Sequence, residues 1–413
     1  MAANNIDFTS DELNAPAWMD EQFFMDVLSQ HLNDPSLKLI ECKISPATAK
    51  GDHYSSIMFR VKVRYTVQQK TFDKSLIIKT MPETDGHKKE FMGDSQMFPT
   101  EIAIYTEILP KFEEILSAAG EKITFCARCI NHSLEPHQLI VFEDLVPQKY
   151  DVIRKRPATI EEIKSAMGKL AKWQAVSFKL LKDNSGLFDK LQYDLSTMPN
   201  FLDHKILTTG FPTFLEVLDN VESLRKYRKY FEPIKDVIIK RWVEIIREYR
   251  ENRQEDAYYV LCHGDFHLKN MMFKGTDCML IDFQLSYIGS IANDLHYAVY
   301  LIFSPENRRH NLDELIYHYF TTFQNTLEII GYQGTLPSLV EFRKQLFDRK
   351  YTDIFLISTL LPIFNHMRRG HDPAEVMEKA DTRRELFYDK EYLEDLEYLL
   401  PRMLHLGYFE NLE

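Results

Sequence analysis

The sequence is poor in the features that mark secreted, membrane-spanning and disulfide-bonded proteins. Its five cysteines follow no framework spacing, and the one CxxC pair, at residues 126–129, has no second pair with which to bind zinc. The longest candidate apolar run, IFLISTLLPIF at residues 354–364, is shorter than the roughly 18 residues that a membrane-spanning helix needs. The N-terminus lacks the basic and apolar regions of a secretory signal. We therefore expect a soluble, cytoplasmic protein with no membrane partner.

Basic residues are also in deficit. The chain has 50 Lys and Arg against 62 Asp and Glu, which gives a formal net charge of −12 at pH 7. Nucleic-acid-binding proteins gain affinity when basic side chains neutralise phosphates, so this balance gives a nucleic-acid partner no support. The 413 residues, 45% of them hydrophobic, are enough for two or three domains or for one two-lobed enzyme. Nothing in the sequence predicts an obligate protein partner.

The first part of the chain is rich in β patterns. In SIMFRVKVRYTV, which starts at Ser56, apolar and polar residues alternate with the period of two that marks a strand with one buried face. Three further strands are expected at residues 37–45, 75–82 and 137–145. FPTEIAIYTEILPKFEEIL, at residues 98–116, has the apolar spacing of a helix. These patterns predict a small sheet accompanied by one helix.

Beyond about residue 150 the chain consists of long amphipathic stretches that are typical of helices, and only one convincing hairpin interrupts them. The pattern predicts an α+β fold with a small β-rich lobe and a larger, mostly helical lobe. We expect an N-terminal helical extension at residues 1–35, a nucleotide-binding N-lobe at 36–145, and a C-lobe with the catalytic and substrate-binding residues at 146–413.

The interrupting stretch, VLCHGDFHLKNMMFKGTDCMLIDFQ, places several polar side chains beside two short apolar runs. Gly275 suits a tight turn between these runs, and antiparallel pairing then brings Asn270 opposite Ile281, next to Asp282. Asp265 precedes Asn270 by five residues, in a loop that can reach the same place. Carboxylate and amide oxygens without a thiol suit a hard cation such as Mg²⁺. The sequence therefore predicts a magnesium site at the open end of the hairpin.

Two alternatives to magnesium remain at this point. His263, Asp265 and His267 occupy alternate positions and could share one face of a strand as the ligands of a hydrolytic zinc site. That zinc hydrolase interpretation leaves Asn270 and Asp282 without roles. In the second alternative, the histidines only satisfy backbone groups of an ordinary loop, which explains one histidine better than the whole cluster.

A magnesium site of this kind predicts a nucleotide bound by the β-rich part. Lys79, near the end of the strand SLIIK, can aim its ammonium at phosphates, and Glu101 in the following helix can pair with it. The segment PATAKGDHYSS can cover phosphates through its backbone N–H groups and through the hydroxyls of Ser55 and Ser56. It contains a single glycine, Gly51, so an ordinary hairpin turn is an equal alternative for that segment.

The order of these parts is that of a kinase fold. The spacing from Asp265 to Asn270 matches the H-R-D-x-x-x-x-N catalytic loop, and IDF answers to the metal-binding DFG. HGDFHLKNMMF and LIDFQ resemble the kinases of choline, aminoglycosides and related small molecules. More narrowly, AKGDHYSSIMFRV, SLIIKTMP, FPTEIAIYTEILP, IVFEDL and IDFQLSYIGSIANDLHY resemble the ecdysteroid kinase-like (CHK kinase-like) family, over about residues 40–400.

The resemblance implies a bilobal protein-kinase-like fold that uses ATP and Mg²⁺. It implies that Asp265 is the catalytic base that orients the substrate hydroxyl, and that Asn270 and Asp282 are catalytic residues that hold Mg²⁺. It also implies that His263 and Asp294 brace the catalytic loop. The nucleotide contacts that it implies are Lys79 on the phosphates with Glu101 as its partner, Gly51, Ser55 and Ser56 over the phosphates, and a hinge with Phe142, Glu143 and Leu145 at adenine.

Departures from the protein kinases favour a small-molecule substrate. His267 stands where they commonly carry Lys, and Gln284 stands where they have the Gly of DFG. We predict a phosphotransferase that acts on the hydroxyl of a small-molecule alcohol, either an ecdysteroid or steroid-like alcohol or a xenobiotic. A catalytically silent kinase-like binding protein remains an alternative. The substrate pocket is expected between the catalytic loop and the helices after Asn293, where these aromatic residues either line the pocket or belong to the core: Tyr297, Tyr300, Phe303, Tyr317 and Phe320.

Overall fold

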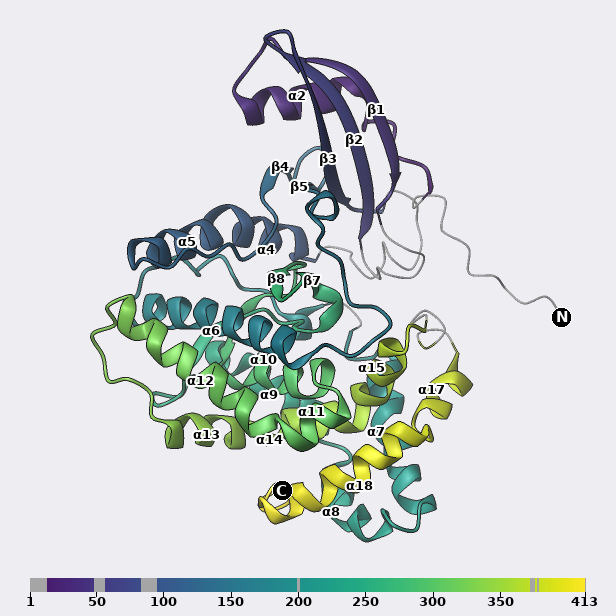
Figure 1. Cartoon of the computed structure of the whole chain (residues 1–413). Coiled ribbons are helices and arrows are strands. Elements are labelled where there is room, and N and C mark those ends of the chain that lie inside the picture. The colour runs from purple at the N-terminus through teal and green to yellow at the C-terminus, as the bar shows by residue number, and fades with distance from the viewer. Residues whose placement is uncertain are drawn as a thin grey trace, which may run out of the picture.

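The computed structural model describes residues 13–47, 56–82, 95–198, 201–371, 376 and 379–412. Its N-terminal part contains a five-stranded antiparallel sheet in the order β1-β2-β3-β5-β4 (Figure 1). The strands are β1 (Lys38–Pro46), β2 (Ile57–Val67), β3 (Lys70–Thr80), β4 (Cys129–Ser133) and β5 (Leu139–Glu143). The four strands predicted from the sequence are all present, and β4 is an additional strand that the patterns did not indicate.

The alternation along β2 decides which face of the sheet is buried. Phe59, Val61 and Val63 are at most 2% exposed, whereas the charged residues between them point away from this core. Helix α2 (Glu21–Leu32) lies along the sheet (Figure 1), and its buried residues belong to the same cluster. The side chain of Asp20 caps this helix by accepting the N–H of Phe23 at 2.8 Å. One face of the sheet is thus covered by the N-terminal helix.

The predicted helix after β3 is one continuous helical segment with a π turn inside it. It comprises α4 (Met97–Ala103), the π turn η1 (Ile104–Ile108) and α5 (Leu109–Ala118). Pro110 has no N–H to donate to the carbonyl four residues earlier, so the hydrogen-bond ladder must adjust around it. The N–H of Leu109 bonds instead to the carbonyl of Ile104. The segment lies between the sheet and the helical part (Figure 1).

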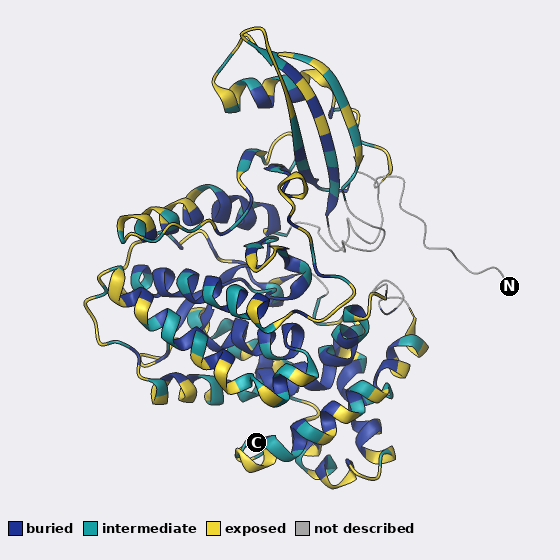
Figure 2. Cartoon of the chain, in the orientation of Figure 1, coloured by how far each residue is buried: buried dark blue, intermediate teal, exposed yellow. Residues whose placement is uncertain are grey.

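The remainder of the chain is mostly helical, and Figure 2 shows its buried residues concentrated along the inner sides of the helices. The central helix α6 (Ile160–Lys182) begins with a capping box in which Thr159 and Glu162 bond to each other's backbone. The other helices of the described residues are α7 (Lys205–Asn220), α8 (Arg228–Phe231), α9 (Ile238–Glu251), α10 (Ala292–Tyr297), α11 (Pro305–His310), α12 (Leu312–Ile329), α13 (Leu339–Asp348), α14 (Lys350–Phe355), α15 (Leu361–Arg368), α17 (Ala380–Leu386) and α18 (Lys390–His405). Two further π turns are η7 (Ala298–Ile302) and η8 (Leu356–Leu360). The short 3₁₀ turns are η2 (Val146–Gln148), η3 (Leu195–Thr197), η4 (Arg225–Tyr227), η5 (Glu232–Ile234) and η6 (Leu268–Asn270).

Two small antiparallel ribbons interrupt the helices. In the first, β7 (Met271–Lys274) pairs with β8 (Asp277–Leu280) across the two-residue turn Gly275–Thr276, as the sequence predicted. The N–H of Ile281 then bonds to the carbonyl of Asn270 at 3.0 Å, which confirms the predicted register. The second ribbon pairs β6 (Tyr259–Cys262) with β9 (Tyr287–Ser290) and was not predicted.

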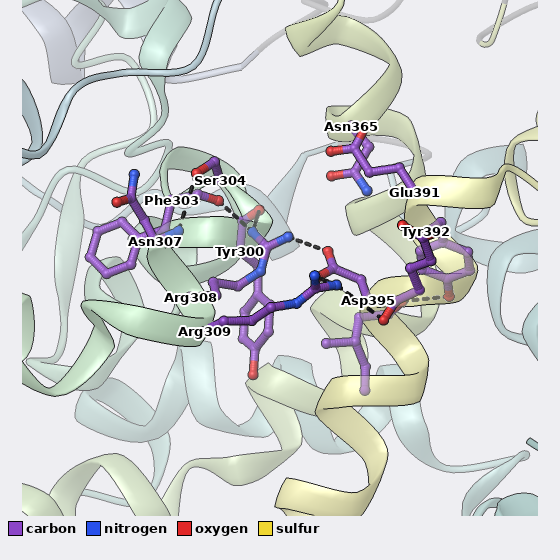
Figure 3. A network of polar contacts seen from close by, with 12 residues as sticks. Tyr300, Phe303, Ser304, Asn307, Arg308, Arg309, Asn365, Glu391, Tyr392 and Asp395 are labelled. Atoms are coloured by element: carbon purple, nitrogen blue, oxygen red, sulfur yellow. Dashed lines mark hydrogen bonds and ion pairs between the residues drawn. The ribbon is translucent and has the colours of Figure 1, made fainter.

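The C-terminal helix is held by a buried ion pair. Arg308 of α11 contacts Asp395 of α18, and both side chains are at most 1% exposed. Arg309 lies 3.8 Å from the other oxygen of Asp395. Figure 3 shows both arginines reaching toward this carboxylate, and it shows the Arg308 guanidinium close to the carbonyl of Phe303, which accepts a hydrogen bond from it. This network connects α11, the end of η7 and α18.

The predicted fold class is confirmed: a five-stranded sheet forms the N-terminal part, and a larger, mostly helical part follows it. The proposed domain limits after residues 35 and 145 stay predictions. Among the described residues, every helix is either too short or too polar to span a lipid bilayer.

Candidate active site

A cavity of about 380 Å³ lies between the sheet and the helical part. Residues of β2, β3 and β5 line one side, and the β7–β8 ribbon with α7, α9 and α15 lines the other. Eight of the predicted site residues line this one cavity: Lys79, Glu101, Phe142, Glu143, Leu145, Asp265, Asn270 and Asp282. Some of these residues are separated by about half of the chain in sequence. The fold therefore places the separate motifs beside one another around a single cavity.

Lys79 is a buried cation on the side of the cavity that the sheet lines. Its Nζ lies 2.5 Å from Oε2 of Glu101 and 2.8 Å from Oδ1 of Asp282, and its side chain is 4% exposed. Burial alone lowers the pKa of Lys79, but the carboxylates of Asp282 and Glu101 outweigh it and raise the pKa above its ordinary value. The amine therefore stays protonated and joins β3, α4 and the end of the β7–β8 ribbon.

Glu101 is almost completely buried, with 1% of its surface exposed. This burial raises the pKa of Glu101 to about 7, against the opposing effect of Lys79. Its carboxylate also accepts a hydrogen bond from the backbone of Phe283. Because Glu101 contacts both the lysine and the residue after Asp282, it fixes the position of each relative to the other.

Asp282 sits where the chain leaves the ribbon, with an unusual backbone φ of 65°. The following Phe283 is fully buried and stacks on Trp173, with ring centroids 5.3 Å apart, and its edge meets Tyr105 at 5.0 Å. This aromatic anchor holds the sharp bend. The bend aims the Asp282 carboxylate into the cavity, where its Oδ1 meets Lys79.

Asp294 holds the loop that carries Asp265. Its carboxylate accepts the backbone N–H groups of His263 at 2.7 Å and Gly264 at 3.1 Å, together with the amide of Gln174 at 2.9 Å. Burial raises the pKa of Asp294 to about 7, although these three donors act in the opposite direction. The expectation that Asp294 braces the loop is confirmed by these contacts.

The contacts of His263 do not fit the zinc alternative. Its Nε2 bonds to the carbonyl of Ile281 at 3.2 Å, while its Nδ1 accepts the N–H of Asp265 at 3.4 Å. Both ring nitrogens are thus occupied, and burial lowers the pKa of His263 to about 4, so the ring is neutral. Among the described residues, no cluster of three His, Cys, Asp or Glu side chains is arranged to hold a metal.

Asp265 faces the cavity from the loop between β6 and η6. Its Oδ2 accepts hydrogen bonds from Nδ2 of Asn270 at 2.8 Å and from Nε2 of His267 at 3.1 Å. Burial would raise the pKa of Asp265, but the attraction of His267, with the hydrogen bonds, lowers it below its ordinary value. Asp265 is therefore ionised near neutral pH and is able to accept a proton.

Asn270 and Asp282 offer hard oxygen ligands at the same edge of the cavity. The Asn270 amide donates through Nδ2 to Asp265, so its carbonyl oxygen points elsewhere and is able to bind a cation. Asp282 uses Oδ1 for Lys79, and its Oδ2 accepts no hydrogen bond from a described residue. An amide oxygen and a carboxylate oxygen without a thiol fit Mg²⁺.

The predicted hinge lines the cavity where β5 ends. Phe142, Glu143 and Leu145 are all among the lining residues. The N–H of Glu143 bonds to the carbonyl of Arg128, whereas the N–H of Leu145 has no hydrogen-bond partner among the described residues. Leu145 lines the cavity, and no described residue competes for its N–H group.

Asp144 is a hinge residue that sequence reasoning did not single out. Its Oδ2 accepts Nε of Arg60 and the hydroxyl of Ser75, both at 2.7 Å, and its Oδ1 accepts the N–H of Val146 at 3.1 Å. The carboxylate thus ties the hinge to β2 and β3. An acidic residue directly after an apolar strand was the single local signal for this role, because the partners of Asp144 lie 84 and 69 residues earlier.

The predicted phosphate-covering segment is only partly visible. Gly51 and Ser55 lie outside the described residues. Ser56 is described at the start of β2, where it is 3% exposed and is not among the residues that line the cavity. Its predicted hydroxyl contact with phosphate has no geometric support.

The side of the cavity away from the sheet is apolar, and most of its residues were not foreseen. Only Tyr297 of the five suggested aromatic residues lines it. Tyr300, Phe303 and Phe320 belong to the core, and Tyr317 is 51% exposed on the surface. The lining residues on this side are Leu195, Met198, Phe201, His204, Ile206, Leu207, Trp242, Tyr297, Phe355, Leu360, Ile363, Phe364 and Met367.

Comparisons with solved structures give distant likenesses. Choline kinase from Cryptosporidium parvum Iowa II is 12% identical, with 94% of this chain and 98% of that chain covered and a TM-score of 0.44. Spectinomycin phosphotransferase, solved in complex with ADP and spectinomycin, is also 12% identical, with 91% and 97% covered and a TM-score of 0.39. At these identities and TM-scores the likenesses assign no role to any residue of this chain. No curated protein matches it significantly.

The amino-acid sequence also matches the model of a protein family. The model of the ecdysteroid kinase-like family matches residues 50–332, which is more than half of the 413 residues. The matched range contains the Lys79, Asp265, Asn270 and Asp282 positions described above. The chain belongs to the ecdysteroid kinase-like family.

Proposed function

We propose that the protein transfers the γ-phosphoryl group of ATP, with Mg²⁺, to a hydroxyl of a small organic molecule. The single observation that carries this proposal is the meeting of Lys79, Asp265, Asn270 and Asp282 in one cavity, with Lys79 held by two carboxylates. Phosphoryl transfer needs little covalent chemistry from a protein, and it depends on positioning and on neutralising phosphate charge. These residue types match that requirement.

The nucleotide occupies the sheet side of the cavity in this proposal. Lys79 contacts the phosphates, while the N–H of Leu145 donates to the adenine edge. The oxygens of Asn270 and Asp282 hold Mg²⁺, which neutralises the phosphate oxygens when it is bound. Asp144 acts indirectly, since its bonds to Arg60 and Ser75 keep the hinge in register with the strands.

Asp265 accepts the proton of the substrate hydroxyl. The hydroxyl oxygen forms a bond to the γ-phosphorus, the bond from that phosphorus to the β–γ bridging oxygen breaks, and ADP leaves with the electron pair. The proton passes to the Asp265 carboxylate, whose depressed pKa keeps it ionised beforehand. The products are a phosphate ester and ADP.

The acceptor is an uncharged, largely apolar alcohol, such as an ecdysteroid, a steroid-like alcohol or a xenobiotic. Among the described residues that line the side formed by α7, α9 and α15, there is no Asp or Glu. A cationic acceptor would lose hydration there without gaining a counter-ion, which is costly. Apolar walls instead favour transfer of apolar surface out of water. The family resemblance points to the same class.

The test is to incubate the protein with ATP, Mg²⁺ and a panel of ecdysteroids, choline, ethanolamine and plant toxins, and to detect added phosphate by mass spectrometry. Asp265→Asn should lower kcat by roughly 10²- to 10⁴-fold and largely spare ATP binding. Lys79→Ala should chiefly weaken productive nucleotide positioning. Asp313→Asn, an exposed carboxylate of α12, is the matched control and should change neither.

Undiminished turnover in Asp265→Asn would overturn the role given to Asp265, and normal ATP kinetics in Lys79→Ala would overturn the nucleotide assignment. The catalytically silent alternative makes a different prediction. In that case the wild-type protein binds ATP with Mg²⁺, measured by calorimetry, yet it phosphorylates no member of the panel.

A further inference from the structure

We propose that His267 is a positioning residue that fixes the Asp265 carboxylate so that one defined oxygen, Oδ1, meets the acceptor hydroxyl. The inference rests on the phosphotransferase function proposed above and extends it to a residue that neither binds Mg²⁺ nor takes the proton. His267 is 8% exposed, lines the cavity, and lies two residues after Asp265.

The hydrogen bonds of His267 determine where its proton lies. Its Nδ1 accepts the backbone N–H of Lys269 at 3.2 Å, so this nitrogen carries a lone pair. In the neutral ring the proton is therefore on Nε2, which lies 3.1 Å from Oδ2 of Asp265. The imidazole donates to the carboxylate, and the backbone bond to Lys269 prevents the ring from flipping without losing a partner.

A second donor converges on the same carboxylate oxygen. The Nδ2 of Asn270 lies 2.8 Å from Oδ2 of Asp265 and 3.0 Å from the backbone carbonyl of that residue. No described residue donates to Oδ1 of Asp265. Two donors on one oxygen fix the rotation of the carboxylate and leave the other oxygen to accept from a substrate hydroxyl. A general base must present its lone pair within hydrogen-bond reach of the proton that it removes.

The ring of His267 is itself held in place. Its Nδ1 caps the short turn η6, and its ring lies 5.2 Å from that of Phe364 of α15, on the apolar side of the cavity. The imidazole thus joins the catalytic loop to the acceptor wall. If acceptor binding moves Phe364, the contacts of His267 would transmit that movement to the Asp265 carboxylate.

Two substitutions separate the two nitrogens of the ring. In His267→Gln the side-chain amide can reach as far as Nε2 and can still donate to Asp265, but it loses the contact with the N–H of Lys269. In His267→Asn the side-chain oxygen can replace Nδ1 as the cap of η6, but it leaves Asp265 without this donor. Both variants are compared with wild type by acceptor phosphorylation, ATP kinetics and thermal unfolding.

We expect His267→Asn to lower kcat by roughly 10- to 100-fold with little change in the KM for ATP, because a hydrogen bond to a charged group is lost. His267→Gln should recover most of that loss. If His267→Asn is at least as active as His267→Gln, then His267 acts by capping η6 and not by donating to Asp265. That result would overturn the positioning role. If wild type phosphorylates no acceptor, the proposed function itself fails, which is a different result from a wrong order of the two variants.

A second measurement is independent of turnover. Nitrogen NMR of the protein with ¹⁵N-labelled histidine, with the His267 signal assigned by its absence in His267→Gln, reports which nitrogen carries the proton. We expect protonation at Nε2 in the wild-type protein without nucleotide, and a changed Nε2 signal in Asp265→Asn. Protonation at Nδ1, or an Nε2 signal that is indifferent to Asp265→Asn, would overturn the inference even in an active enzyme.

Discussion

At the scale of single residues, the site depends on ionisable groups that the fold has removed from water. Asp294 is 2% exposed and holds the loop that carries Asp265 through the N–H groups of His263 and Gly264. Burial raises its pKa from 3.8 to about 7. Between these two pH values the folded protein therefore binds a proton that the unfolded chain has released, and this contribution to stability is lost as the pH rises.

We predict that Asp294→Asn lowers the free energy of unfolding by about 1–3 kcal/mol, because an amide has one accepting oxygen for several N–H donors. The stability gap between wild type and variant should narrow as the pH rises from about 4 to about 7, since only the carboxylate titrates. Urea unfolding of both proteins at several pH values in this window measures the gap. A gap that widens with pH would show that the three hydrogen bonds outweigh burial.

His263 titrates over nearly the same pH range, but its effect on the pH dependence of stability has the opposite sign. For this reason the wild-type protein must be compared with Asp294→Asn at each pH. Burial lowers the pKa of His263 to about 4, so the unfolded chain binds more protons than the folded protein between about pH 4 and 6.5. Its contribution to stability is full above pH 6.5 and is lost as the pH falls. Subtracting the variant curve from the wild-type curve removes this shared contribution.

At the scale of elements, two glycines shape the polar cluster for different reasons. Gly264, next to Asp265, has a φ of 83°, and a Cβ there would lie 2.0 Å from the carbonyl oxygen of Leu285. Gly275, in the turn between β7 and β8, has a φ of 60° with no atom within 4 Å of such a Cβ. The first position is constrained by both space and backbone conformation, the second by conformation alone.

We predict that Gly275→Ala costs about 1–2 kcal/mol of unfolding free energy, the ordinary penalty of a left-handed backbone. Gly264→Ala should cost about 2–5 kcal/mol, because the loop must also move away from Leu285. It should also lower kcat, since that movement carries Asp265 with it. Urea unfolding and acceptor phosphorylation measure the two effects. Equal costs at the two positions would contradict the tight packing of the Gly264 loop against Leu285.

At the scale of the whole molecule, buried charge ties the C-terminal helix to the rest. Arg308 of α11 and Asp395 of α18 are separated by 87 residues and contact each other with both side chains at most 1% exposed (Figure 3). Arg368 of α15 donates to the carbonyls of Tyr300 and Phe303, which Arg308 also contacts. Phe364 of the same helix α15 lines the apolar side of the cavity. The network therefore supports one wall of the candidate site from outside.

We predict that Asp395→Ala lowers the free energy of unfolding by about 3–5 kcal/mol, because it leaves the buried guanidinium of Arg308 without a counter-charge. The matched control is Glu216→Gln, which breaks the exposed pair with Arg384 and should cost no more than about 1 kcal/mol. Urea unfolding compares the two variants. Similar small losses in both would mean that the C-terminal helix is held by its apolar contacts alone.

Much of the architecture follows from local patterns. The alternation in β2 and the turn at Gly275 were readable because strand period and turn chemistry act over a few residues. The pairing of β6 with β9 could not be predicted, because neither four-residue strand has a residue pattern that identifies the strand with which it pairs. The spacing of Asp265 and Asn270 likewise indicated chemistry, while the contacts of Asp144 with Arg60 and of His267 with Phe364 depend on elements far away in the chain.

By itself, the sequence determined the order of the motifs, the register of the β7–β8 ribbon and the set of side chains that suit a cation and phosphates. These properties are local, because propensity, spacing and side-chain chemistry act along the chain. Only the tertiary structure decided that Lys79 lies between Glu101 and Asp282, that both nitrogens of His263 are engaged, and that the second half of the cavity is apolar. Those outcomes come from the packing of distant elements, which fixes burial and hence both pKa and ligand preference.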